Sequence, residues 1–277
     1  MKDKSIKDFS ISKETFQLVY DKQYKMFRTQ FDYSKSIESY YESSDYISHS
    51  DETNNLFEKI YQTVKKYSIH KKWYWINKLS NSYQSVLDIG CGTGEFLKYG
   101  VDHLHKNGIG VEPNTKARQI AKEKNISVFS SIHEIQSQKF DIITLWHVLE
   151  HVSNLDEYFT FFKNYLNKNG SLIIAVPNYN SYDAQHYNQY WAAWDVPRHL
   201  WHFSKESLPL LMQKYHFHLK EIKPMWFDSY YVSLLSEQYK HGKKRWISAI
   251  IHGSISNLKA IFTKEYSSLI YVFEKNE

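Results

Sequence analysis

The clearest ligand-binding signal in this chain is a short loop with three glycines at alternate positions. The loop Gly90–Gly94 follows the apolar run Ser85–Ile89, and Phe96–Leu104 continues with helical spacing. Glycine is needed where a backbone turns sharply and where a ligand contacts the main chain at the start of a helix. A dinucleotide-binding fingerprint requires its third glycine at position 95, which is Glu95 here. The spacing therefore disfavours an NAD-type cofactor.

An acidic residue ends the next apolar run, Gly108–Glu112, 18 residues beyond Gly94. A carboxylate at such a strand end accepts hydrogen bonds from both hydroxyls of a bound ribose. The glycine loop alone is explained equally well by a tight strand-to-helix turn without a ligand. Together with Glu112, it predicts the two halves of an adenosine site in the expected order.

The glycine loop and Glu112 are positioned by a regular alternation of strands and helices. We expect strands at Ser85–Ile89, Gly108–Glu112, Ile126–Phe129, Phe140–Leu145, Ser171–Val176, Phe217–Lys223 and Leu269–Phe273. Helical spacing lies between them, at Phe96–Leu104, Thr115–Lys124 and Asn154–Leu166. This succession predicts an α/β fold, a doubly wound, Rossmann-like and mostly parallel sheet of seven strands. Its ligand is expected at the carboxyl ends of the strands.

The pattern also divides the chain. Residues 1–80 are expected to form a helical N-terminal cap, 81–224 the core, and 225–277 a helical lid with the final strand. Trp226–Phe262 reads as two helices inserted before that strand, since this aromatic stretch is too long for a hairpin loop. We expect the lid and the segment Tyr46–His49 to cover the strand ends.

Three segments resemble class I S-adenosylmethionine-dependent methyltransferases. Asp88–Gly94 is similar to their first motif, an acidic residue followed by G-x-G-x-G. Phe140–Val152 resembles the fourth strand and following helix of the branch that contains ubiquinone-biosynthesis O-methyltransferases, and Gly170–Asn178 resembles its fifth strand. The resemblance implies S-adenosylmethionine as cofactor and methyl transfer to a small molecule, with oxygen as the expected acceptor atom.

The same resemblance implies which residues hold the cofactor. Asp88 would anchor the loop and the methionine amino group, and Glu112 would bind the ribose. Ser131 and Ile132 replace the acidic residue that the family often has near the end of its third strand. The full implied set is Asp88, Gly90, Cys91, Gly92, Gly94, Glu112, Pro113, Ser131, Ile132, Trp146 and His147.

The methyl acceptor is expected beside an aromatic loop after the fifth strand. This loop, Asp195–Phe203, carries an Asp-x-Pro-x-His pattern that resembles a bacterial subgroup of unassigned substrate. A hydroxyl acceptor benefits from a nearby base, for which His199 is the first candidate and His151 its rival. Substrate contacts are expected from Tyr46, His49, Trp194, Asp195 and Arg198. An interpretation of Asp195 and Arg198 as a purely structural clamp stays open.

His147, Glu150 and His151 have the spacing of one helix face. Such a set can hold a divalent metal, as the resemblance to some quinol O-methyltransferases suggests. The alternative, that Glu150 and His151 orient the helix beside the cofactor, is favoured, and no metal is included in the expected site.

Composition narrows the remaining classes of function. The chain has 277 residues, a net charge of +5, 17% aromatic residues and a single cysteine, Cys91. Neither a signal peptide nor an apolar run of membrane-spanning length is evident, so a cytoplasmic protein is expected. A methyltransferase of RNA or protein is one alternative, although Lys240–Arg245 is only a short basic patch rather than a nucleic-acid module. A regulatory protein that binds the cofactor without turnover is another. The oligomeric state is not predicted.

Overall fold

The computed structural model describes residues 1–32, 36–41, 56–79, 83–136 and 138–275. The chain divides into two compact units. We call Ser44–Leu145 with Thr160–Ile173 the glycine-loop unit. The remaining segments, Met1–Ser43, Trp146–Phe159 and Ile174–Asn276, form the histidine unit.

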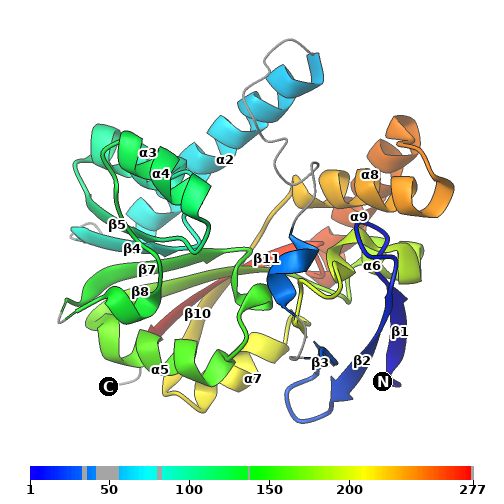
Figure 1. The fold of residues 1–277 in the computed structure, drawn as a ribbon, viewed down its shortest axis with the longest axis horizontal. Coiled ribbons are helices and arrows are strands. Elements are labelled where there is room, and N and C mark those ends of the chain that lie inside the picture. Colours follow the sequence, from blue (N-terminus) through cyan, green and yellow to red (C-terminus); the bar gives the residue numbers. More distant parts are fainter. Residues whose placement is uncertain (33–35, 42–55, 80–82, 137, 276–277) are drawn as a thin grey trace. The chain divides into compact units, whose positions relative to one another are not determined.

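The glycine-loop unit is built from parallel strands and the helices that connect them (Figure 1). Its strands are nearly continuous apolar runs because the sheet is buried, as Val86, Leu87, Ile142 and Ile143 illustrate. In chain order its elements are α2 (Leu56–Leu79), β4 (Ser85–Ile89), α3 (Glu95–Leu104), β5 (Asn107–Val111), α4 (Thr115–Glu123), β6 (Ser127–Phe129), η2 (Ile132–Glu134), β7 (Phe140–Trp146) and the first part of β8 (Leu166–Pro177).

The central sheet has seven strands in the order β10-β11-β8-β7-β4-β5-β6. β4 pairs in parallel with both β5 and β7, and β5 with β6. At the other edge, β10 (Phe217–Pro224) and β11 (Ser268–Lys275) pair antiparallel. The expected doubly wound, mostly parallel seven-stranded fold is confirmed.

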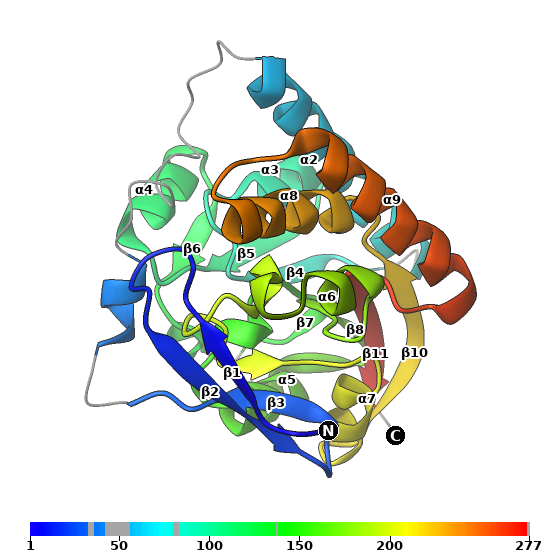
Figure 2. The ribbon, with the colours of Figure 1, turned by 90° about the vertical axis from the view of Figure 1, so that its right-hand side faces the viewer.

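The histidine unit contains a second sheet, which the sequence pattern did not predict. β1 (Lys4–Lys7), β2 (Thr15–Asp21), β3 (Met26–Thr29) and β9 (Trp201–His202) form a four-stranded antiparallel sheet. Figure 2 shows β1, β2 and β3 running side by side. The expected helical cap over residues 1–80 is therefore wrong for residues 4–29. Its helix begins at Leu56, and before it the structure describes only one short turn, η1 (Ile37–Tyr40).

The remaining elements of the histidine unit are short, apart from two helices between the last strands. These two are α8 (Asp228–His241) and α9 (Trp246–Thr263), which lie side by side in Figure 2. The insertion of a helical pair before the last strand agrees with the expected lid, whose placement over the strand ends stays a prediction. The others are η3 (Leu149–His151), α5 (Leu155–Tyr165, which continues into the glycine-loop unit), α6 (Tyr182–Tyr187), η4 (Asn188–Tyr190), η5 (Ala192–Trp194) and α7 (Ser207–Gln213). Among the described helices, none combines the length and the apolar character needed to cross a membrane.

Gly100 allows α2 to pack against α3, and we expect Gly100→Ala to destabilise the protein by about 2 kcal/mol. The indole N–H of buried Trp73 donates to the Phe96 carbonyl at 2.8 Å, and the two rings stack with centroids 4.6 Å apart. A Cβ at position 100 would overlap three ring carbons of Trp73. This overlap outweighs the gain in helix propensity of about 1 kcal/mol that alanine brings.

Urea unfolding measures the effect, and a Trp73→Leu background supplies the control. The cost of Gly100→Ala should largely disappear there, because the double-mutant cycle removes the overlapping ring. An equal cost in both backgrounds would show that the indole is not its cause.

Candidate active site

The loop between β4 and α3 adopts a conformation that side chains other than glycine rarely tolerate. Gly90, Gly92 and Gly94 have φ angles of 72°, 55° and 76°. A Cβ at Gly94 would approach the Cβ of Ala121 to 3.0 Å, so this glycine also permits close helix packing. At Gly92, by contrast, a Cβ would meet no atom within 4 Å. The loop is thus shaped by its glycines and leaves space beside its centre.

Glu112 holds this loop through the backbone. Its Oε2 accepts a hydrogen bond from the Gly92 N–H at 2.9 Å, and its Oε1 accepts one from the Asn114 N–H at 2.8 Å. The Gly90 and Cys91 N–H groups both donate to the Val111 carbonyl, at 2.7 and 3.1 Å. Each carboxylate oxygen has a second lone pair, so Glu112 can keep both backbone hydrogen bonds and still accept hydrogen bonds from a ligand.

Cys91 is a packing residue at the centre of the loop. Its side chain is buried, and burial raises the pKa of the thiol far above its usual value. A Cβ at Gly110 would overlap its sulfur, so the glycine in β5 makes room for this side chain. The contribution of Cys91 to a ligand would therefore come from its backbone, as the sequence implies.

Asp88 lies at the end of β4 with only 2% of its surface exposed. Thr144, its register partner on β7, donates a hydrogen bond to Asp88 Oδ1 at 2.6 Å. Burial raises the pKa of Asp88 to about 7, although the Thr144 hydrogen bond acts in the opposite direction. A buried carboxyl with this pKa gains most from a cationic partner, because pairing restores the interactions that its charge lost with water.

The residues after β5 and β6 form two capped turns. Arg118 donates to the Glu112 and Pro113 carbonyls at 2.8 and 2.6 Å, which fixes the turn before α4. The Ser131 hydroxyl caps η2 by accepting the His133 N–H at 3.3 Å, and Ile132 is buried. The turn contains no carboxylate at Ser131 or Ile132, as expected from the sequence; its hydroxyl caps η2 and its apolar side chain is buried.

The glycine-loop unit brings together nine of the eleven implied cofactor residues. The two others, Trp146 and His147, belong to the histidine unit. Their contacts with a cofactor stay predictions.

His147 bridges two carboxylates within the histidine unit. Its Nδ1 lies 3.1 Å from Glu150 Oε1 and its Nε2 lies 2.8 Å from Asp228 Oδ2, at the start of α8. Although burial opposes the charged form, Asp228 and Glu150 raise the pKa of His147 to about 10. His147 is therefore a cation at neutral pH, held between two anions. Asp228 is 81 residues away in the sequence, and no motif marked it.

The expected single helix face is not formed. His147 has a φ of 57°, and only Leu149–His151 forms a short 3₁₀ turn. The i, i+3 contact between His147 and Glu150 does occur. His151 instead packs against His199, with ring centroids 4.6 Å apart in an edge-to-face arrangement.

The charge on His147 predicts that this bridge weakens in alkaline solution. A raised folded-state pKa stabilises the fold fully below the ordinary histidine value of 6.5, and this stabilisation is lost as the pH rises through about 10. The melting temperature of His147→Gln should therefore lie well below that of the wild-type protein at pH 6.5. The gap should narrow by pH 10 in thermal melts. His103→Gln, at an exposed site on α3, serves as the control and should show a small gap. A constant gap for His147→Gln would contradict the assigned charge.

Glu150, His151 and His199 form a compact group in which Glu150 and His199 are buried and His151 is half-buried. One potential ligand atom from each lies within 4.8 Å of the others. Glu150 is fully buried, and among the described residues its Oε2 has no hydrogen-bond partner. The trio can therefore hold a divalent cation. Alternatively, Glu150 can orient a histidine that accepts a proton.

The two histidines have defined tautomers in their neutral forms. His151 Nδ1 lies 3.1 Å from both the Arg198 carbonyl and the Tyr41 hydroxyl, and His199 Nδ1 lies 2.9 Å from the Ala193 carbonyl. A carbonyl only accepts and a hydroxyl can also accept, so in a neutral imidazole each Nδ1 carries the proton and each Nε2 keeps a lone pair. Burial, followed by the charge of His199, lowers the pKa of His151 to about 4. His151 is therefore neutral at physiological pH.

Asp195 and Arg198 make the contacts that the clamp interpretation predicts. Arg198 forms a bidentate pair with Asp195, and it also donates to the Tyr40 carbonyl at 3.0 Å and to Ser10 Oγ at 2.7 Å. Trp194 is buried in an aromatic cluster with Phe27 and Tyr179, so its contacts are those of a core residue. Substrate contact by these residues stays a prediction. Tyr46 and His49 lie outside the described residues.

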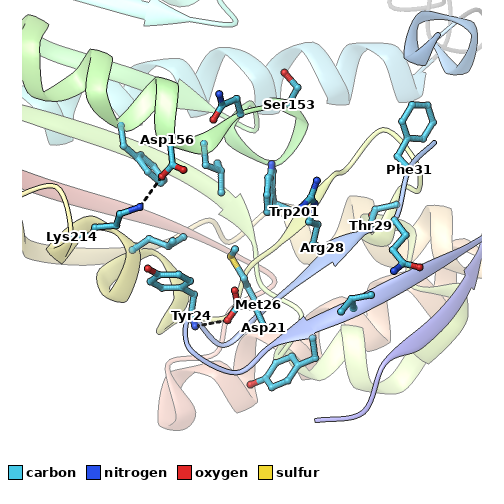
Figure 3. A pocket seen from close by; sticks show the side chains of 17 residues that line it. Asp21, Tyr24, Met26, Arg28, Thr29, Phe31, Ser153, Asp156, Trp201 and Lys214 are labelled. Atoms are coloured by element: carbon cyan, nitrogen blue, oxygen red, sulfur yellow. Dashed lines mark hydrogen bonds and ion pairs between the residues drawn. The ribbon is translucent and has the colours of Figure 1, made fainter. Parts of the chain in front are cut away.

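A groove of about 920 Å³ lies elsewhere in the histidine unit (Figure 3). Its walls come from β2, β3, β9, the start of α5 and the end of α7. Arg28 lies over the Trp201 ring, 5.3 Å from its centroid, and Lys214 pairs with Asp156, which also lines the groove. None of the described residues expected to contact the acceptor lines it. The sequence pattern gave no signal for this groove, because β2 and β3 were not recognised as strands.

Comparison with known proteins decides the family. Residues 51–222, more than half of the chain, match the family described as methyltransferase domain. The chain belongs to this family. The matched region of this methyltransferase-domain protein includes the glycine loop, Glu112 and the Glu150, His151 and His199 group.

Curated relatives match a shorter part of the chain. A ubiquinone biosynthesis O-methyltransferase of Rickettsia felis is 30% identical over 123 residues, which covers 38% of this chain and 48% of the relative. One of Glaesserella parasuis is 33% identical over 120 residues, covering 38% and 50%. The chain thus spans about half the length of the curated relatives it matches.

Solved structures show the same fold. Magnesium protoporphyrin IX methyltransferase of Synechocystis, solved with bound S-adenosylhomocysteine, has a TM-score of 0.55 at 11% identity. The matched region covers 87% of this chain and 98% of the chain in that structure. At this identity the likeness shows the fold alone.

Proposed function

We propose that this chain binds S-adenosylmethionine and transfers its methyl group to an oxygen of a small molecule. The observation that carries the proposal is the glycine loop with its positive φ angles. Glu112 accepts a hydrogen bond from this loop, and the buried carboxyl of Asp88 precedes it in the chain. Family membership supports methyl transfer, and the names of the curated relatives support oxygen as the acceptor atom. A cytoplasmic location is part of the proposal, in keeping with the single buried cysteine.

The residues of the glycine-loop unit fit this cofactor. Asp88 would pair with the amino group of its methionine part, and Glu112 would accept hydrogen bonds from the ribose hydroxyls. Backbone at Gly90–Gly92 would lie against the methionine and sugar, in the space that a Cβ at Gly92 would fill. Ser131 and Ile132 would face the adenine. When bound, S-adenosylmethionine supplies an electrophilic methyl group on a sulfonium.

The chain's own contribution to the reaction is alignment and proton removal. Methyl transfer requires the acceptor oxygen in line with the methyl group, and a base near that oxygen adds about 10²–10⁴-fold. His199 and His151 each retain an Nε2 lone pair for this purpose. Both belong to the histidine unit, together with the 920 Å³ groove, which is large enough for a small-molecule ligand.

Calorimetry with S-adenosylmethionine, S-adenosylhomocysteine and NAD tests the cofactor. We expect micromolar binding of an adenosyl ligand and none of NAD. Glu112→Ala should weaken binding by more than about 1 kcal/mol, since both ribose hydroxyls lose their charged partner. Glu112→Gln should lose less, because one acceptor oxygen remains. Binding of NAD without either adenosyl ligand would overturn the proposal.

Turnover is tested by a screen for cofactor consumption against phenols, quinols, sugars, lipids and transfer RNA. Turnover of a phenol or quinol supports a small-molecule O-methyltransferase. Turnover of transfer RNA alone would instead identify an RNA methyltransferase.

A further inference from the structure

The outward face of α9 carries two groups of exposed apolar side chains, one on each side of Ser254. The members of both groups are exposed by 40% or more, and their spacings of three, four and seven residues place them on one side of the helix. We call this set the α9 stripe: Ile247 (77% exposed), Ile250 (56%), Ile251 (51%), Leu258 (61%), Ile261 (40%) and Phe262 (86%). Single exposed apolar residues are ordinary on a protein surface, but six large ones on one helix face mark an interaction site.

The opposite face of α9 explains why the stripe points outward. That buried face carries small and polar residues: Ala249, Gly253, Ser256, Asn257 and Ala260. A Cβ at Gly253 would overlap the Tyr230 ring, and the Asn257 side chain donates to the Trp226 carbonyl at 2.9 Å. The packing of α9 against α8 is therefore fixed by small residues and hydrogen bonds. The usual amphipathic arrangement is inverted, and the largest apolar side chains remain outside.

Positive charge is concentrated in the segment from the end of α8 to the end of α9. Residues 238–264 contain six lysines and arginines and no acidic residue, whereas the whole chain has a net charge of only +5. The rest of the chain therefore carries one more negative than positive charge. Lys243, Lys244 and Arg245 are exposed in the loop directly before α9, and Trp246 is 44% exposed at the start of the helix.

We propose that the α8–α9 pair docks on the surface of an anionic phospholipid bilayer. The α9 stripe lies at the boundary of the acyl chains, and Lys243–Arg245 lie among the headgroups. Apolar burial and attraction to anionic lipids are the two contributions that hold a helix in a membrane interface, and α9 offers both. This binding does not depend on the proposed methyl transfer.

Charge and side-chain type favour lipid over the other occupants. A second copy of this chain would bring two strongly basic segments together, and their repulsion opposes a dimer through this face. Nucleic acid matches the charge, but it is bound through basic grooves and aromatic stacking rather than through a stripe dominated by isoleucine. An anionic bilayer satisfies the charge and the apolar stripe together.

Co-sedimentation of the full chain with vesicles tests the proposal. One set contains phosphatidylcholine alone, and the other contains about one third phosphatidylglycerol. We expect binding to the anionic vesicles at least about tenfold stronger than to the neutral ones, and weakened by salt. Ile247→Ser with Ile251→Ser, and separately Lys243→Glu with Lys244→Glu, should each reduce binding by about tenfold or more.

Matched changes on α4 provide the controls. Ile120→Ser and Lys116→Glu with Lys122→Glu alter exposed residues of the same types and should leave vesicle binding unchanged. Melting temperatures establish that every variant is folded. No binding of the wild-type chain to anionic vesicles would overturn the proposal, and so would binding that the α9 variants leave intact. A dimer that the Ile→Ser pair dissociates, without vesicle binding, would assign the face to a second copy. Binding of RNA in place of vesicles would also overturn it.

Discussion

Replacing Asp88 with Asn should weaken S-adenosylmethionine binding by about 100-fold at pH 7.5. The carboxyl is buried at the end of β4, and its described side-chain hydrogen bond comes from Thr144. A ligand ammonium would pair with it in a site that excludes water, where removal of one charged partner typically costs 2–5 kcal/mol. Asparagine keeps the size of the side chain and the Thr144 contact but loses the charge. Calorimetry measures the effect.

The same residue predicts how affinity depends on pH. Burial raises the pKa of Asp88 to about 7, so in the free protein it is mostly protonated in weak acid. Pairing with an ammonium requires the carboxylate, and binding must then release a proton. The affinity of the wild-type protein should fall by up to about tenfold per pH unit below 7, whereas that of Asp88→Asn should change little.

Asp102→Asn is the matched control for Asp88, since Asp102 lies on α3 in the same unit and is exposed. It should bind with wild-type affinity at every pH. Wild-type affinity that stays constant from pH 5.5 to 7.5, together with near-normal binding by Asp88→Asn, would contradict the role of this carboxyl.

The glycine-loop unit could be predicted because its signals are local. Parallel strands buried on both faces appear as short apolar runs, and the positive φ angles of Gly90, Gly92 and Gly94 require glycine itself. Each strand is followed by its own helix within a few residues. Composition and periodicity are therefore sufficient to predict most of the strands, helices and turns of the glycine-loop unit.

The antiparallel sheet could not be predicted in the same way. β1 is four residues long and contains a single apolar residue, the buried Ile6, so its sequence resembles that of an exposed segment. In β2, Phe16 and Leu18 alternate with exposed residues, which is a genuine strand signal but a short one. The fourth strand, β9, pairs Trp201 with Arg28, far away in the sequence. Pairing at that separation leaves no trace in local periodicity.

The site in the histidine unit shows the same limit. His147, Glu150 and His151 were recognised by their spacing, but the geometry of this segment depends on residues far along the chain. Asp228 pairs with His147, and the loop containing His199 supplies the partner of His151. Tertiary contacts thus divide a sequence-local cluster into an ion bridge and a pair of packed imidazoles.

His199→Ala should reduce turnover of the true acceptor by about 10²–10³-fold without changing cofactor affinity. A catalytic base works best with a pKa near the working pH, and His151, with a pKa lowered to about 4, is poorly suited to that role. His151 is better placed to orient the His199 ring, which it contacts edge to face. The single-turnover rate at saturating acceptor is the measurement, with His103→Gln as an exposed control.

The partner variants and a chelator separate the remaining explanations. His151→Ala should lose less activity than His199→Ala if His199 removes the proton and His151 positions it. Full turnover by His199→Ala with loss in His151→Ala would move the assignment to His151. Loss in both, together with inactivation by a chelator and recovery on adding Mg²⁺, would show that the trio with Glu150 holds a cation that activates the acceptor oxygen. Normal turnover by both variants would leave alignment as the source of catalysis, because an acceptor that is already a good nucleophile needs only to be held in line with the methyl group.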